Sequence, residues 1–151
     1  RRCPGPCVVT RRVRVAARWL LAVLYFGAGV LHLLQPAPFA SIVPAWVPRP
    51  DMVVWLTGIA EIAGALALAQ PWSVPFRKAA GISLATYALC VWPANFQHMA
   101  LDLARPGSGL GLAYHLPRLA AQPLLIWLAL WTASVTGWPF RRRRREPPPF
   151  R

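Results

Sequence analysis

Long apolar segments alternate with short polar links along the whole chain. Four segments carry about 20 mostly apolar residues each, the length of helix that crosses a hydrocarbon core of about 30 Å. They cover residues 15–34, 52–70, 79–97 and 119–138. Most prolines lie in the links, where they end helices rather than interrupt them. The pattern predicts an all-α fold, an integral membrane four-helix bundle over residues 15–138.

The chain outside these segments forms two basic flanks. We expect residues 1–14 to be a disordered N-terminal arm and residues 139–151 to be a disordered tail rich in Arg and Pro. A signal peptide would have an apolar run of only about 7–15 residues, followed by an A-x-A cleavage site. The first apolar segment is longer and lacks that site, so we expect it to remain as a membrane span.

Composition and charge support a membrane protein. Hydrophobic residues make up 56% and charged residues 14% of the chain, against about 45–50% and about 25% in soluble domains. The net charge is +13. The basic residues flank the apolar segments and form no helix face with stacking aromatic residues, which argues against nucleic-acid binding.

The distribution of basic residues predicts the topology. They gather before the first segment, at Arg77 and Lys78 in the second link, and at residues 141–145 after the fourth segment. Cytoplasmic loops carry an excess of Lys and Arg. We therefore expect a multi-pass protein of the inner (plasma) membrane with both termini in the cytoplasm.

Helical spacing places one acidic residue inside the bundle. Gly58, Glu61 and Gly64 share one face of the second segment, and small residues mark close contact between helices. A carboxylate that faced lipid at this depth would cost several kcal/mol. Tyr25 lies at the same depth in the first segment, and we expect its hydroxyl to contact Glu61. Glu61 either handles protons or binds a ligand, or else only fixes helix packing.

Further polar residues lie nearer the outer side of the membrane. We expect His32, Asn95 and Gln122 to form a polar layer about 10 Å beyond Glu61, with Arg118 and His98 at the rim. The arrangement describes a funnel that opens outward, with an acid at its floor. The candidate ligand-binding residues are Glu61, Tyr25, His32, Asn95, Gln122 and Arg118.

Two prolines and one histidine leave questions of local structure. Pro93 either kinks the third span or ends it, and Pro123 lies inside the fourth span or begins it with Gln122 as the cap. His115 is expected to be solvated in a loop. No nucleophile–base pair, metal-ligand cluster, haem-ligand pair or nucleotide motif can be assembled. We therefore expect no metal, no cofactor carried by the chain, and no enzyme that acts alone.

Several motifs together resemble the DoxX family over about residues 14–135. The resemblance rests on Ala28-Gly29-Val30-Leu31-His32, on Gly58, Glu61 and Gly64, on Pro93-Ala94-Asn95, and on Leu116-Pro117-Arg118-Leu119 with Gln122. The chain departs from the family at Leu33, where an aromatic residue is usual, and in having one more residue between Arg118 and Gln122. His32, Glu61, Asn95 and Arg118 match the family's polar motif residues.

The resemblance implies a small four-helix protein of the bacterial inner membrane that is associated with redox systems. The first function it suggests is an accessory subunit in the lipid bilayer, which binds a quinone or a small polar molecule beside a partner oxidoreductase subunit. The second is a structural or assembly protein without a ligand. The third is a conduit for a small solute or for protons. Assembly into a homo-oligomer is compatible with each of them.

Overall fold

The computed structural model describes residues 6–107 and 109–138, and within them every regular element is a helix. Four helices are long, and a fifth, short helix lies between the first two long ones. In chain order they are α1 (Pro6–Leu34), α2 (Pro36–Ala40), α3 (Pro50–Ala69), α4 (Val74–Leu103) and α5 (Leu112–Thr132). The predicted all-α fold is confirmed for this part of the chain.

The helices extend beyond the apolar segments that predicted them. Helix α1 begins at Pro6, so the prediction of a disordered arm is wrong for residues 6–14. Arginine is a good helix former, and an arginine-rich stretch can therefore continue an apolar helix. Helix α4 begins at Val74, where the Ser73 hydroxyl accepts a hydrogen bond from the Phe76 amide at 3.3 Å. The predicted disorder of residues 1–5 and 139–151 lies outside the described residues.

Prolines lie inside two of the long helices. Helix α4 continues through Pro93, and α5 begins at Leu112, well before Pro123. The alternatives in which these prolines end or begin a helix are therefore wrong. Gln122 is not a cap, because its side-chain amide donates to the Ala88 carbonyl of α4 at 3.3 Å.

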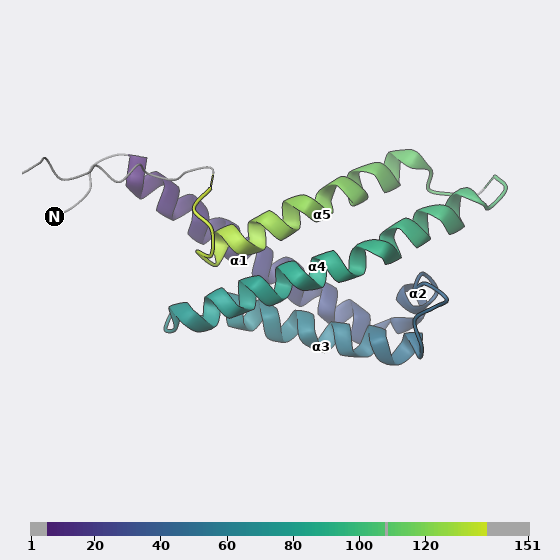
Figure 1. The fold of residues 1–151 in the computed structure, drawn as a ribbon, viewed down its shortest axis with the longest axis horizontal. Coiled ribbons are helices and arrows are strands. Elements are labelled where there is room, and N and C mark those ends of the chain that lie inside the picture. Colours follow the sequence, from purple (N-terminus) through teal and green to yellow (C-terminus); the bar gives the residue numbers. More distant parts are fainter. Residues whose placement is uncertain (1–5, 108, 139–151) are drawn as a thin grey trace, which may run out of the picture.

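The four long helices lie side by side and run alternately in opposite directions (Figure 1). Helix α1 packs against α3, α3 against α4, α4 against α5, and α5 back against α1. Helix α2 packs against α1 and α3 at the end of the molecule where α4 is followed by α5 (Figure 1). We call this the open end. The opposite end, where α3 and α5 finish and α4 begins, is the closed end.

Alanines, three leucines and one tyrosine form the core at the closed end and in the middle of the molecule. The buried cluster consists of Leu21, Ala22, Tyr25, Ala65, Leu68, Ala80, Leu84, Ala85, Ala129 and Ala133. A Cβ on Gly81 would lie 2.2 Å from the Cβ of Ala133 and 2.7 Å from the carbonyl oxygen of Ala129. Helices α4 and α5 are therefore in direct contact at this glycine.

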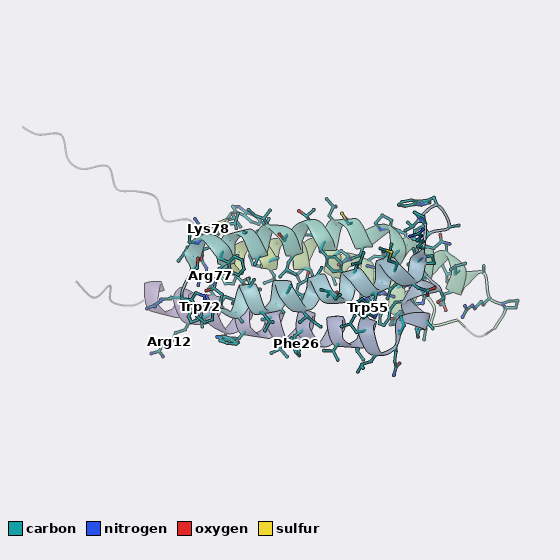
Figure 2. All side chains as sticks on the ribbon, turned by 90° about the horizontal axis from the view of Figure 1, so that it is seen from below. Arg12, Phe26, Trp55, Trp72, Arg77 and Lys78 are labelled. Carbon is teal, nitrogen blue, oxygen red and sulfur yellow. The ribbon has the colours of Figure 1, made fainter. Side chains whose placement is uncertain are left out.

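The outer surface of the helices is apolar. Large side chains such as Val23, Phe26, Trp55 and Leu66 are exposed, and Figure 2 shows side chains projecting outward along the length of the helices. Two helices, over Arg11–Leu34 and Pro50–Ala69, are long and apolar enough to cross a membrane. Only 22% and 33% of their most apolar stretches are buried, so they are not helices hidden in the core of the protein.

Candidate functional site

Helices α1 and α3 cross in contact at two glycines. A Cβ on Gly29 would lie 2.6 Å from the Gly58 carbonyl oxygen, and a Cβ on Gly58 would lie 2.9 Å from the Cβ of His32. The missing side chains allow this approach. It brings His32 beside Glu61, which is only 4% exposed. The prediction that Glu61 points into the protein is confirmed.

Two side chains from neighbouring helices hold the Glu61 carboxylate. Its Oε2 lies 2.7 Å from Nδ1 of His32 on α1. Its Oε1 accepts a hydrogen bond from the Tyr87 hydroxyl on α4 at 2.8 Å. An ionised carboxylate can only accept hydrogen bonds, and here each oxygen has a donor. The Glu61 carboxyl group therefore joins α1, α3 and α4 through two hydrogen bonds.

The neighbours of His32 fix the position of its proton. Nδ1 also lies 2.9 Å from the Ala28 carbonyl oxygen, which can only accept. This hydrogen-bond network assigns a proton to Nδ1, shared between Ala28 and Glu61. The other ring nitrogen, Nε2, then accepts a hydrogen bond when the ring is neutral and donates one when it is protonated. Glu61 thus orients His32 and leaves Nε2 as the nitrogen that a ligand can use.

The expectation that Tyr25 contacts Glu61 is wrong, because Tyr87 makes that hydrogen bond. The Cα–Cβ bond of a helical residue tilts toward the N-terminus of its helix. In the antiparallel pair α1 and α3, the side chains of His32 and Glu61 therefore lean toward each other, whereas Tyr25 leans away. For the same reason His32 does not belong to a separate layer beyond Glu61.

Tyr25 nevertheless remains part of the site. Its ring meets the Tyr87 ring edge-on, with the centroids 6.3 Å apart. The side chain is 7% exposed, and no group in the described part of the chain forms a hydrogen bond with its buried hydroxyl. A buried polar group without a partner is unfavourable by about 1–3 kcal/mol. The Tyr25 hydroxyl is therefore available to a ligand.

A cavity of about 450 Å³ adjoins these groups toward the open end. This is the size of a pocket that encloses a small organic molecule. The structure brings all six candidate residues to its wall, namely Glu61, Tyr25, His32, Asn95, Gln122 and Arg118. They come from α1, α3, α4 and α5, so the cavity lies among the four long helices.

Most of the cavity wall is apolar. Part of it comes from the link between the first two predicted spans, for which no role in the site was predicted. Helix α2 and the link to α3 contribute Phe39, Ile42, Val43, Pro44 and Val47. The Phe39 ring lies against the imidazole of His32, with a centroid distance of 4.0 Å. The α2 segment therefore covers the His32 side of the cavity.

Arg118 links the cavity to a second polar cluster near the open end. Its Nη1 donates a hydrogen bond to Nδ1 of His98, and its guanidinium lies over the Tyr114 ring, 5.9 Å from the centroid. Burial and the positive charge of Arg118 lower the pKa of His98. The sequence placed both residues at the rim without pairing them, and the structure shows that they form a hydrogen bond.

The prediction that His115 is solvated is wrong. The residue is 0% exposed, and its Nε2 lies 3.0 Å from Oδ2 of Asp102. The Gly111 amide donates to the same oxygen at 3.2 Å. These hydrogen bonds, the one from His115 first, hold the pKa of Asp102 below its usual range. Loop composition alone misled the interpretation, because α5 begins before His115 and buries it.

Two polar residues of these sites were missed in the sequence. Tyr87 lies eight residues before Asn95, and Asp102 lies four residues after His98. Residues four or eight apart lie on one face of a helix. The spacing argument that found Glu61 would find Tyr87 on the interior face of the third segment. It would also find Asp102 if that segment were extended past residue 97.

Comparison with known proteins gives a family without a function. Residues 21–133 match a family described as a domain of unknown function (DUF8561). No curated protein and no solved structure matches the chain. The resemblance to the DoxX family stays a prediction. Because the match covers more than half of the chain, the protein belongs to the DUF8561 family.

Proposed function

We propose that the chain is a multi-pass membrane protein in which the four long helices form a membrane-spanning bundle. The main support is the exposed apolar surface. Soluble monomers rarely expose large contiguous apolar patches, whereas this surface carries large apolar side chains on all four long helices. Lipid is the environment in which such a surface is stable.

The charge distribution supports cytoplasmic termini. Figure 2 shows Arg12, Arg77 and Lys78 near the same end of the molecule, and this closed end also carries Arg11 and Arg14 at the start of α1. The positive-inside rule assigns that end to the cytoplasm. A topology reporter fused after Trp138 should then be cytoplasmic, and one inserted within residues 104–111 should be outside. The reverse result would contradict the orientation.

We further propose that the cavity binds an amphipathic small molecule of the quinone type, in a protein that serves as an accessory subunit to a membrane oxidoreductase. One observation carries this proposal. An apolar cavity of about 450 Å³ has at its wall the paired Glu61 and His32, and the Tyr25 hydroxyl, which has no hydrogen-bond partner among the described residues. A ring with carbonyl oxygens would pack on the apolar wall and accept a hydrogen bond from Tyr25.

The partner subunit follows from the resemblance to DoxX proteins and from the chemistry of the site. The cavity wall offers hydrogen-bonding groups, which would hold a quinone and supply protons as the partner subunit provides the electrons that reduce it. The proposal therefore assigns electron transfer to the partner and ligand binding to this chain.

A titration with decyl-benzoquinone tests the ligand. The protein in mild detergent should bind the quinone saturably, and Tyr25→Phe should weaken binding about 10-fold through the loss of one hydrogen bond. The control is Tyr114→Phe, which removes a hydroxyl from an exposed residue outside the cavity wall and should bind like the wild type. Absence of saturable binding, or equal affinity in Tyr25→Phe and the wild type, would contradict the proposal.

One observation favours the structural alternative. Both oxygens of Glu61 already have partners within the protein, as a residue that only fixes helix packing would require. The ligand-binding and structural functions differ in what they require of Tyr25. A purely structural role gives no use for its hydroxyl. Quinone binding that depends on Tyr25 would therefore favour the ligand site over the structural role.

A further inference from the structure

Three side chains that are common metal ligands meet at the open end, where α4 finishes and α5 begins. His98 and Asp102 lie one helical turn apart on α4, and His115 comes from the first turn of α5. One potential ligand atom from each side chain lies within 4.8 Å of the others. Arg118, which lines the ligand cavity, connects this cluster to it through its hydrogen bond to His98.

Two of the three ligand atoms are already at the spacing that a metal ion requires. Nε2 of His115 and Oδ2 of Asp102 are 3.0 Å apart. Ligand atoms at about 2.0–2.1 Å from a tetrahedral Zn²⁺ lie about 3.3 Å from one another. The loop fixes the carboxylate, because the Gly111 amide donates to Oδ2 at 3.2 Å. A Cβ on Gly109 would lie 2.9 Å from the same oxygen.

The burial of this pair sets it apart from a surface cluster. His115 is fully buried and Asp102 nearly so. Nδ1 of His115 has no hydrogen-bond partner within residues 6–107 and 109–138. Nδ1 can therefore carry the ring's proton, which leaves the lone pair of Nε2 free for an ion beside Asp102.

His98 completes the set by moving a short distance. Its ring stands perpendicular to that of His115, with the centroids 4.9 Å apart. To reach a tetrahedral spacing, its ligand atom must close by up to about 1.5 Å, and the proposal requires a rotation of the side chain to do so. Nδ1 of His98 now accepts a hydrogen bond from Arg118, so its lone pair is free of a proton. A metal ion would take that lone pair in place of the guanidinium.

We propose that His98, Asp102 and His115 form a binding site for a divalent transition-metal ion, with Zn²⁺ as the ion they fit best. Two imidazole nitrogens and one carboxylate oxygen are the ligands of many three-residue zinc sites, which leave a fourth position for water. The exposed loop residues 104–107 follow the site closely in the chain. This proposal does not rest on quinone binding.

Titration of the full chain with Zn²⁺ by calorimetry tests the site. The protein, in detergent and without a purification tag, should bind one ion per chain. Asp102→Asn and His98→Ala should each weaken binding by more than about 100-fold, since even the groups that orient metal ligands contribute 10–100-fold. The cysteines are a competing source of ligands, so the titration is repeated with Cys3→Ser, Cys7→Ser and Cys90→Ser combined, which should leave the affinity unchanged.

Two further variants distinguish direct coordination of Zn²⁺ by these side chains from nonspecific electrostatic attraction of a cation. Arg105→Gln removes a positive charge near the site without removing a ligand, so Zn²⁺ affinity should stay within a few-fold of the wild type. Arg118→Gln removes the group that competes for His98 and should raise the affinity. Binding that is absent, or that persists in both Asp102→Asn and His98→Ala, would overturn the proposal.

A measurement on the unmodified chain covers the case in which the variants do not fold. X-ray absorption of the zinc-bound protein should show only nitrogen and oxygen neighbours at about 2.0–2.2 Å, with the scattering pattern of two imidazole rings. Sulfur neighbours at about 2.3 Å, or the absence of imidazole scattering, would contradict the site.

Discussion

The four long helices pack differently at the closed end and at the open end. At the closed end, Gly81 and the alanines around it bring α4 and α5 into direct contact. At the open end the helices leave a cavity of about 450 Å³, partly covered by α2, whose mostly apolar wall carries the polar candidate residues. Tightly packed regions tolerate little change in volume. Close packing of α4 against α5 therefore leaves little room for larger residues at the closed end, whereas the open end combines the Gly29–Gly58 contact of α1 and α3 with the polar site.

Tyr25 lies where the two ends meet. Its ring belongs to the buried core, and its side chain also lines the cavity. Next to it, Glu61 on α3 is hydrogen-bonded to His32 on α1 and to Tyr87 on α4, and so connects these three helices. Substitutions on the two sides of this boundary should therefore separate effects on stability from effects on ligand binding.

The largest effect on stability is expected from Gly81→Ala at the closed end. The new Cβ would lie 2.2 Å from that of Ala133 and 2.7 Å from a backbone oxygen, so the two helices must move apart. We expect a loss of about 2–3 kcal/mol in the free energy of unfolding, as for other overpacked cores. Unfolding in mixed detergent micelles measures it.

Gly27→Ala is the matched control for this substitution. Nothing lies within 4 Å of a Cβ at Gly27, so the change should cause no loss of stability. Equal destabilisation by the two substitutions would show that Gly81 does not mark a tight contact between α4 and α5.

A smaller effect is expected from Glu61→Gln at the boundary. The amide keeps one oxygen to accept a hydrogen bond, but its nitrogen cannot accept one, so either His32 or Tyr87 loses its acceptor. The protein should still fold, with a loss of about 1–2 kcal/mol. Stabilisation of the wild type by decyl-benzoquinone should disappear in the variant. If the quinone still stabilised the variant as much as the wild type, the role assigned to Glu61 would be contradicted.

Tyr87→Phe should have a weaker effect of the same kind. It removes one hydrogen bond to the carboxylate and leaves the ring in place against Tyr25. Hydrogen bonds between membrane helices contribute about 1 kcal/mol, and that is the loss we expect in the unfolding measurement. No change in stability would mean that water replaces Tyr87 at Glu61.

The smallest change, and one of opposite sign, is expected from Tyr25→Phe. The substitution removes a buried hydroxyl that has no partner among the described residues, so the ligand-free protein should gain up to about 1 kcal/mol in stability. The same variant should bind quinone less tightly. A loss of stability without ligand would show that the hydroxyl has a structural partner.

Much of the site could be predicted from spacing alone. Gly58, Glu61 and Gly64 lie on one interior face, and a Cβ on Gly64 would lie 2.6 Å from Cδ2 of Leu84, so each glycine does mark a close contact. Residues of the candidate site on four helices line one cavity. Periodicity is sufficient for these statements because it fixes which residues share a face.

The contacts between helices could not be predicted in the same way. Depth arithmetic paired Glu61 with Tyr25, whereas the crossing at Gly29 and Gly58 and the lean of the side chains pair it with His32. Hydropathy ended the third segment at residue 97 and so missed the helical turn that places Asp102 beside His115. Helix ends and side-chain directions depend on caps and crossing geometry, which a hydropathy pattern does not record.

The most direct test of the account is to identify what the protein carries when it is extracted from membranes in mild detergent. Small molecules bound to the wild type and to Glu61→Gln would be identified by mass spectrometry, and bound proteins by proteomics. The account predicts that the wild type carries a quinone and an oxidoreductase subunit. The quinone should be lost in Glu61→Gln. A cavity without any small molecule in a protein that still holds its partner would contradict it and would make Glu61 a packing residue.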